Sequence, residues 1–242
     1  MSTKQVSRPL PIAVTAAVAF FSALGALAVS NGMDMAQAHG NQPEHADTQM
    51  AMTTAAHGSP MLKAKAVALR MDMRKLWEDH ITWTRLAIIS LTTNSPDTEA
   101  TVARLLRNQT DIGNAVKPFY GTAAGDQLTA LLKEHILIAA DLIAAAQAGD
   151  ETAVAAEQAR WVANADQIAA ALHSLNPHNW PLAEMQEMMH RHLDLTTQEV
   201  VARLQGNWNA DVAAYDKVHL EILEMSDVIS DGIVKQFPAR FR

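Results

Sequence analysis

The chain has 242 residues, of which 49% are hydrophobic and 5% aromatic, and it contains no cysteine. Its 19 Lys and Arg residues against 26 Asp and Glu residues give a formal net charge of −7. The lack of cysteine excludes disulfide scaffolds, thiolate nucleophiles, zinc sites with cysteine ligands and iron–sulfur clusters. The acidic balance, without a dense basic run, argues against nucleic-acid binding. The length and the many Ala, Leu and Ile residues favour a helical protein of one or two domains.

Residues 1–38 are typical of an export signal. Lys4 and Arg8 form a positively charged start, and an almost unbroken apolar run follows over 12–29. Ala36-Gln37-Ala38 is a small-residue cleavage site, so we predict that the signal is cleaved after Ala38. The mature protein is then exported to the periplasm or the extracellular space, with no membrane contact after cleavage. The alternative is a retained anchor, because about 18 apolar residues can just span a bilayer.

Residues 39–61 are predicted to form a disordered tether. This segment has no Leu, Ile, Val, Phe, Trp or Tyr, so it cannot bury a core. It does carry imidazole and thioether side chains, which are the donors that copper prefers. We therefore expect either weak metal binding by the tether or a plain polar linker. The candidate tether ligands are His39, His45, His57, Met50 and Met52.

Residues 62–242 are predicted to form one helical domain. The apolar residues there repeat with the period of an α-helix, and no stretch alternates with a period of two. We expect Ser95 to be the N-cap of the second helix, with Pro96 at its first position. The fold class is therefore all-α, an antiparallel bundle of about six helices with short connections. Breaks in the pattern place the helices at about 62–92, 95–118, 122–149, 150–174, 181–206 and 207–237.

Four of the predicted apolar stripes each carry one histidine. On the last helix the stripe includes Val212, Tyr215 and Ile222, and we expect it to face the core. Helical rise places all four histidines in the middle third of the bundle, where their side chains can meet. They are His80, His135, His192 and His219.

The spacing of polar residues suggests an internal repeat. His80, His135 and His192 are almost evenly spaced along the chain. If consecutive helices are taken in pairs, the second helices carry Gln109, Asn164 and His219, which are evenly spaced as well. The pattern predicts three helical hairpins of about 55 residues, with a polar residue at mid-height on both helices of each. The alternative is that similar helix lengths produce these spacings by chance.

Buried imidazoles must find polar partners, and two arrangements supply them. A shared metal ion would satisfy several at once, and copper or zinc suits imidazoles without thiolates. A hydrogen-bonded network would do the same. The predicted metal ligands are His80, His135, His192 and His219. Around them we expect Asp216, one turn from His219 and orienting it, together with Gln109 and Asn164.

Other chemistry finds little support in the sequence. Glu187 and His190 have the Glu-x-x-His spacing of di-iron bundles, which also need a Glu from two further helices. The available residues, Glu78 and Glu134, lie off the apolar stripes, so the di-iron set is not expected to assemble. Two further histidines, His173 and His178, are predicted at the surface. The chain has no phosphate-binding glycine loop and no nucleophile elbow, so an enzyme is less favoured than a non-enzymatic protein.

Several segments together resemble a group of small exported bacterial helical proteins of unsettled function. Members of that group often carry inherited enzyme labels such as glycosyltransferase or acetylglutamate kinase. The resemblance spans about 62–237 and implies domain limits but no active site. The sequence has no nucleotide-binding feature and no Asp-x-Asp pair, so it supports neither label. The segments are Leu76-Trp77-Glu78-Asp79-His80, Leu105-Leu106-Arg107-Asn108-Gln109, Lys133-Glu134-His135-Ile136-Leu137-Ile138-Ala139, Trp161-Val162-Ala163-Asn164-Ala165-Asp166, His192-Leu193-Asp194-Leu195-Thr196-Thr197 and Ser230-Asp231-Gly232-Ile233.

The sequence as a whole favours an exported metal-binding or metal-handling protein of the cell envelope. Its predicted partner is a metal ion, copper or zinc, and no protein partner is indicated. One alternative is a non-catalytic structural or interaction bundle whose buried histidines form a polar network. A redox metalloenzyme is a further alternative.

Overall fold

The computed structural model describes residues 60–242. The predicted signal peptide and the predicted tether up to residue 59 lie outside the described residues, whereas Pro60 and Met61 already belong to a helix. The described part contains helices and no strand, which confirms the all-α prediction. The elements are α2 (Pro60–Thr93), α3 (Thr98–Tyr120), α4 (Thr122–Ala148), α5 (Glu151–Leu175), α6 (Leu182–Leu204), α7 (Trp208–Gln236) and the short 3₁₀ helix η1 (Pro238–Phe241).

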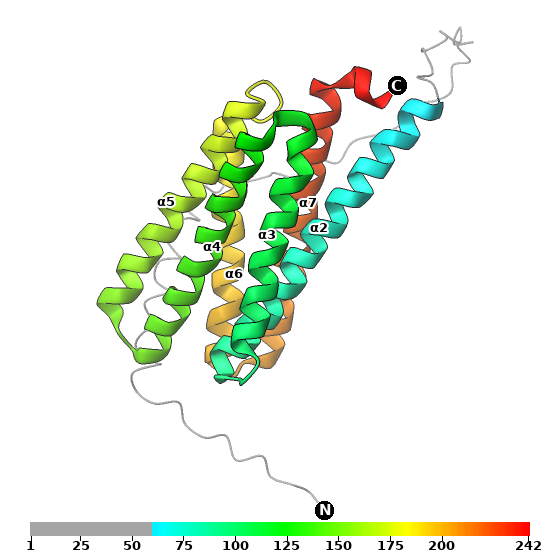
Figure 1. Cartoon of the computed structure of the whole chain (residues 1–242). Helices are drawn as coiled ribbons and strands as arrows, with labels where there is room; N and C mark the ends of the chain where they lie inside the picture. The colour runs from blue at the N-terminus through cyan, green and yellow to red at the C-terminus, as the bar shows by residue number, and fades with distance from the viewer. Residues whose placement is uncertain (1–59) are drawn as a thin grey trace, which may run out of the picture.

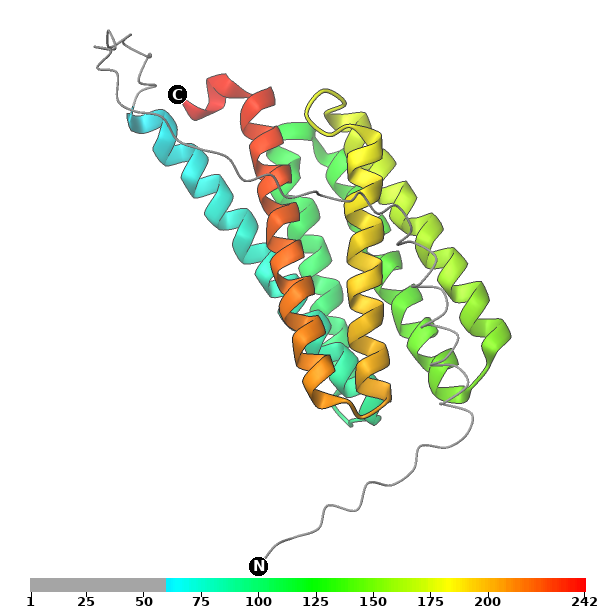
Figure 2. The ribbon, with the colours of Figure 1, turned by 180° about the vertical axis from the view of Figure 1, so that it is seen from behind.

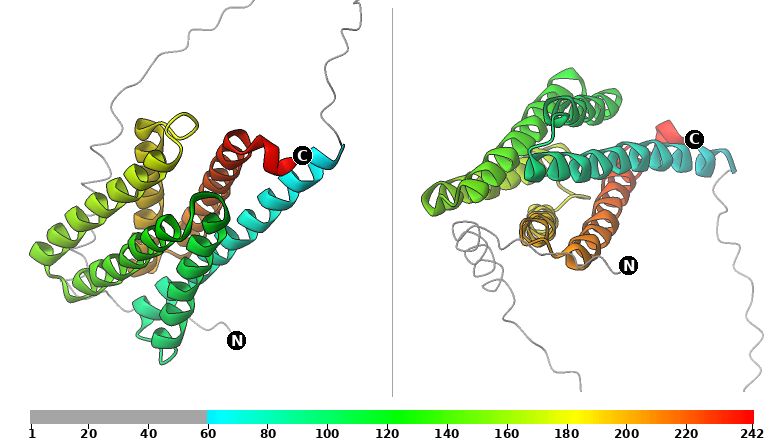
Figure 3. Two further views of the ribbon diagram at one scale, coloured as in Figure 1. Left: turned by 45° about the horizontal axis from the view of Figure 1, so that its top comes forward. Right: turned by 90° about the horizontal axis from the view of Figure 1, so that it is seen from below.

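The long helices pack into a closed ring. Each packs beside the next in the sequence, and α7 packs back against α2. Figure 1 shows α3 and α4 on the near side of the bundle, and the reverse view in Figure 2 shows α6 and α7 covering the opposite side. The N-terminal end of α2 extends beyond the other helices, beside η1 and the C-terminus (Figure 3). None of the helices within 60–242 is both long and apolar enough to cross a bilayer.

The ring consists of three helical hairpins, as the repeat predicted: α2–α3, α4–α5 and α6–α7. The turn of each hairpin contains one residue with positive φ, namely Asn94 (φ 50°), Gly149 (71°) and Gly206 (69°). Asn and Gly are the residues that adopt this conformation with least strain. Each follows the histidine of its own hairpin at the same interval in the sequence. A helical rise of about 1.5 Å per residue therefore places all three histidines roughly 21 Å from their turns.

The second helix of two hairpins begins with a side-chain cap. Asp150 accepts a hydrogen bond from the backbone N–H of Ala153 at 2.9 Å, and Asn207 accepts one from Ala210 at 3.3 Å. In the first hairpin the predicted cap at Ser95 is wrong, and α3 begins at Thr98. The reason is that the Ser95 backbone N–H donates to Ser90 O (2.9 Å), so Ser95 belongs to the turn that closes the C-terminal end of α2.

A buried cluster of charges fixes α2 against α6 and α7. Arg85 pairs with Glu199 at 2.8 Å and with Asp211, and Arg203 pairs with Asp211 at 3.1 Å. Both carboxylates are fully buried, and burial raises the pKa of Glu199. Removing one partner of such a cluster leaves an uncompensated buried charge, so the cluster holds these three helices in one register.

The buried face of α7 follows the predicted stripe from Ile222 onward and differs from it before that residue. Val212 is 53% exposed and His219 is half-buried, whereas Val218 and Glu221 are in the core. The face is displaced because two acidic residues, Asp211 and Glu221, point inward toward partners on other helices. A pattern that assigns charged residues to the solvent side cannot locate this face.

Candidate histidine site in the bundle core

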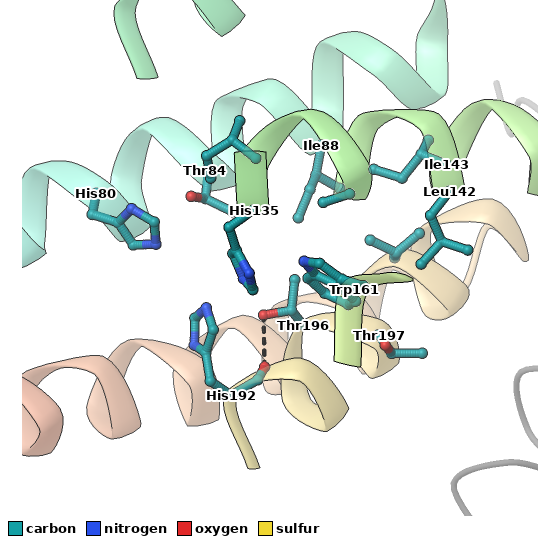
Figure 4. Close-up of a pocket in the computed structure, with 13 residues that line it drawn as sticks. His80, Thr84, Ile88, His135, Leu142, Ile143, Trp161, His192, Thr196 and Thr197 are labelled. Carbon is teal, nitrogen blue, oxygen red and sulfur yellow. Dashed lines mark hydrogen bonds between the residues drawn. The ribbon is translucent and has the colours of Figure 1, made fainter. Parts of the chain in front are cut away.

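Three of the four predicted histidines meet in the core. His80, His135 and His192 are each at most 4% exposed, and they come from α2, α4 and α6, the first helix of each hairpin. The His192 ring lies between the other two, with its centroid 6.0 Å from that of His80 and 6.1 Å from that of His135. Figure 4 shows the three rings converging from separate helices. The inward-facing stripes predicted for α2, α4 and α6 are confirmed at these positions.

Each imidazole is held at Nδ1 by the second helix of its own hairpin. The partner lies 29 residues after the histidine in every case: Gln109 for His80 (3.1 Å), Asn164 for His135 (2.8 Å) and Glu221 for His192 (3.0 Å). The predicted contacts of Gln109 and Asn164 are therefore present. The third member of the repeat is Glu221 and not His219. The interval from Asn164 to Glu221 equals that from His135 to His192, and this was the signal that could have identified it.

The hydrogen bonds of Asn164 fix the protonation pattern of His135. The Asn164 amide nitrogen donates to Leu131 O at 3.2 Å, so its oxygen faces His135 and accepts from Nδ1. His135 Nε2 then carries a lone pair, and it is buried without a hydrogen-bond partner. The Glu221 carboxylate likewise accepts from His192 Nδ1. Both rings are thus held at Nδ1 by an oxygen from the second helix of their own hairpin.

His80 has a different partner arrangement. The Gln109 amide nitrogen donates to Leu105 O (2.9 Å) and to Asn108 Oδ1 (3.2 Å), and it lies 3.1 Å from His80 Nδ1. The Gln109 oxygen is buried with no partner. An amide nitrogen facing Nδ1 makes that atom an acceptor, so the proton of neutral His80 is on Nε2 in this arrangement.

Two of the imidazoles are neutral at physiological pH. Burial lowers the pKa of His80 and of His135 to about 3, and the neighbouring His192 ring acts in the same direction. Desolvation disfavours the charged imidazolium, which explains the direction of both shifts. The neutral ring is the form that binds metals.

The three rings border one end of a cavity of about 40 Å³. This volume has room for about three water molecules. Two other lining residues, Thr84 and Trp161, have a buried hydroxyl and a buried indole N–H without partners. The Trp161 ring lies 5.2 Å from the His135 ring (Figure 4). Apolar side chains form most of the remaining wall: Ile88, Ile136, Ala139, Leu142, Ile143 and Val200.

As the side chains stand, no three His, Asp or Glu residues within 60–242 form a group that could hold a metal ion. Metal–nitrogen bonds of about 2.0–2.1 Å place the centroids of two bound imidazoles roughly 5–5.5 Å apart. The separations of 6.0 and 6.1 Å around His192 are wider than this.

His219 does not join the three core histidines. It lies between α7 and α2, where its Nε2 is 2.8 Å and 2.9 Å from the two Glu78 oxygens and its ring stacks on Tyr215. The side chains of His219 and Glu78 are 30% and 45% exposed. Asp216 is exposed, and the carboxylate that orients His219 is Glu78, so the role predicted for Asp216 is wrong.

The remaining candidate ligands are scattered over the surface or lie outside the described residues. Glu134 and Glu187 are exposed, and His190 pairs with Asp166 at 3.0 Å, so a di-iron set does not assemble. His178 is exposed as predicted, whereas His173 is half-buried with its Nδ1 2.9 Å from Trp180 O. The tether residues outside the described part are His39, His45, His57, Met50 and Met52.

Comparison with known proteins gave no match. No family model, no curated protein and no solved structure is significantly similar to the chain. The resemblance to exported bacterial helical proteins therefore stays a prediction.

Proposed function

We propose that the chain is an exported metal-binding or metal-handling protein that binds copper or zinc through His80, His135 and His192. The observation that carries the proposal is the convergence of three buried imidazoles on one cavity, each held at Nδ1 from its own hairpin. Metal-binding histidines are normally oriented in this way by a hydrogen bond to the other ring nitrogen. The Nε2 atom of His135 already has a lone pair without a hydrogen-bond partner.

The side chain that must rearrange is Gln109. Binding through His80 Nε2 requires the ring proton on Nδ1, where an oxygen must accept it. The Gln109 oxygen has no partner, and a half-turn of its amide brings that oxygen to His80 Nδ1. The same half-turn gives up the hydrogen bonds that the amide nitrogen donates to Leu105 O and Asn108 Oδ1, so the ion must compensate for their loss. The ring would then match His135 and His192.

The spacing of the rings requires a small closing movement. Bound imidazole centroids lie roughly 5–5.5 Å apart, so each of the two pairs that include His192 must approach by about 0.5–1 Å, and the His80 and His135 rings on either side of it must approach each other as well. The cavity between the helices leaves space for this movement. The imidazole rings are therefore already oriented for binding, but they must move closer together when the ion binds.

Charge favours copper(I) over a divalent ion. Glu221 is the only carboxylate that hydrogen-bonds any of the three imidazoles among the residues described. With its negative charge and two neutral rings of low pKa, a monovalent cation brings the buried site close to neutrality. A divalent ion would leave an extra buried positive charge, which is costly away from water.

The predicted export signal and tether suggest where the protein would encounter copper. Imidazole and thioether groups before residue 60 would capture copper weakly at the cell envelope, and the core site would retain it. Delivery from the tether to the core needs no catalytic group.

A structural bundle is the second candidate. In the present arrangement neutral His80 carries its proton on Nε2 and lies beside the His192 ring, which favours a hydrogen-bonded network that fixes helix register. In this case the histidines would contribute to stability and bind no ion.

Metal titration separates the two candidates. The full mature chain is titrated with copper(I) under reducing conditions, and separately with zinc, against a competing chelator. We expect about one ion per chain, loss of binding in His135→Ala and in His192→Gln, and retention in the matched surface variant His219→Ala. Far-ultraviolet circular dichroism verifies that each variant is helical. No uptake by the unmodified chain, or uptake that survives both core substitutions, would contradict the proposal.

A further inference from the structure

Three polar groups in the wall of the cavity have no hydrogen-bond partner within 60–242. They are the Nε2 of His135, the hydroxyl of Thr84 and the indole N–H of Trp161, on side chains at least nine-tenths buried. His135 Nε2 carries a lone pair and can only accept, whereas the Trp161 N–H can only donate. A buried polar group is costly unless a partner replaces the water it has lost, so the three groups together indicate a ligand.

Two further threonines line the cavity, and neither supplies those missing partners. The Thr196 hydroxyl already donates to His192 O at 2.8 Å. Thr197 on α6 is half-buried, as is Ala139 on α4, whereas the other residues that line the cavity are buried. The cavity therefore comes closest to solvent beside Thr197 and Ala139, where a small molecule can enter.

The wall of the cavity restricts the chemistry of the ligand. No Asp, Glu, Lys or Arg of the described part lines it, which excludes an ionised ligand because its buried charge would be uncompensated. Apolar side chains, among them Ile88, Leu142 and Ile143, surround the end away from His80 (Figure 4). A volume of about 40 Å³ admits a molecule of two or three heavy atoms. The ligand is therefore small and uncharged, with one polar end and one apolar end.

We propose that the cavity binds a short aliphatic alcohol of one or two carbons, with its hydroxyl between His135 and Trp161. A hydroxyl donates one hydrogen bond and accepts two, which matches the one acceptor and two donors left unpartnered in the wall. It donates to His135 Nε2 and accepts from the Trp161 N–H, whose ring centroid is 5.2 Å from that of His135. Its second lone pair is available to the Thr84 hydroxyl, and its carbons contact the apolar end. A metal ion would use the same His135 lone pair, so this inference concerns the metal-free chain and does not rest on the proposed function.

Titration of the full mature chain with ethanol, in the presence of a metal chelator, tests the proposal. Methyl NMR follows Ile88 and Ile143, which line the cavity. We expect their resonances to shift and to saturate as for a single site. Acetonitrile has as many heavy atoms as ethanol and accepts a hydrogen bond, but it donates none to His135. It is therefore expected to bind about two- to tenfold more weakly than ethanol.

A pair of matched variants tests where the hydroxyl lies. Trp161→Phe removes the N–H and is expected to weaken ethanol binding about two- to tenfold, through loss of one hydrogen bond. Trp77→Phe is the control, since the Trp77 N–H is also buried and unpartnered but its ring lines a different cavity, and it should leave the affinity unchanged. Circular dichroism verifies that both variants are helical.

Three results would overturn the inference. Methyl shifts that grow with ethanol concentration without saturating would show that the cavity holds water only. Equal affinities for ethanol and acetonitrile would show that His135 accepts no hydrogen bond from the ligand, and this comparison needs no variant to fold. Equal ethanol affinities in Trp161→Phe and Trp77→Phe would show that the Trp161 N–H makes no contact with it.

Discussion

Two histidine–glutamate pairs in this protein have nearly the same nitrogen–oxygen distance and different surroundings. His192 and Glu221 are 3.0 Å apart with side chains 5% and 1% exposed, whereas His219 and Glu78 are 2.8 Å apart with side chains 30% and 45% exposed. The core pair lies beside two more imidazoles and a cavity, and the surface pair joins α7 to α2. The two pairs therefore share residue types and distance, and burial decides which of them can form a site.

Of the perturbations considered for the two regions, a lower pH is expected to cause the largest loss in the free energy of unfolding. The pKa of His80 and of His135 is about 3 in the folded chain, against about 6.5 for an exposed imidazole. Below pH 6.5 the unfolded chain therefore binds more protons than the folded one, and stability falls as the pH falls toward 3. At about 1.4 kcal/mol per pH unit for each ring, the two histidines remove roughly 5 kcal/mol between pH 6.5 and 4.5.

Denaturant unfolding across this pH range measures that effect. His135→Leu is expected to remove about half of the histidine contribution to the slope, since one of the two rings is gone. An identical slope in His135→Leu and the unmodified chain would show that these rings are not held neutral by burial.

Removal of each glutamate compares the two pairs directly. Glu221→Ala leaves His192 buried without a partner, and we expect a loss of about 3–5 kcal/mol in the free energy of unfolding. Glu78→Ala removes a half-exposed partner, so the expected loss is below about 1 kcal/mol. Both variants are measured by urea unfolding at neutral pH. Equal losses would mean that burial does not distinguish the two pairs.

A smaller change can make the first hairpin resemble the third. Gln109→Glu provides an oxygen that accepts from His80 Nδ1, as Glu221 does for His192, and it adds a negative charge. We expect zinc affinity to rise about tenfold relative to copper(I) affinity, because a second carboxylate compensates a divalent ion. Competition titrations of the two ions give the ratio. Gln109→Leu is the control, and it should weaken the binding of both ions.

The tether should contribute least to tight binding. Deletion of residues 39–61 should leave one tightly bound ion per chain and remove only weak additional binding, as metal analysis after dialysis would show. A chain that loses its tight ion on this deletion would place the site in the tether instead of the core.

Much of the architecture was accessible from the sequence, because helical periodicity and breaks locate helices. The hairpins and the depth of the histidines followed from spacing and helical rise, and the inward direction of His80, His135 and His192 followed from the apolar stripes. The same reasoning failed at α7, where Asp211 and Glu221 face the core. Their partners, Arg85 and His192, lie on other helices and are distant in the sequence. Rotation of α7 about its axis by the angle between successive residues places Val218 instead of His219 on the buried face.

The candidate site was predictable only in part for a related reason. The repeat identified Gln109 and Asn164 but pointed to His219 in the third hairpin, two residues before Glu221. The cavity and its unpartnered groups, Thr84 and Trp161, depend on how several helices pack. No local pattern carries that information, because Thr and Trp at these positions are equally compatible with a filled core.

X-ray absorption spectroscopy of the copper(I)-loaded full mature chain is the most direct test of the core metal site. We expect a first shell of three imidazole nitrogens at about 2.0 Å, lost in His135→Ala and kept in His219→Ala. A shell made of thioether sulfur, an unchanged shell in His135→Ala, or a chain that retains no copper after dialysis would contradict binding by the three core histidines.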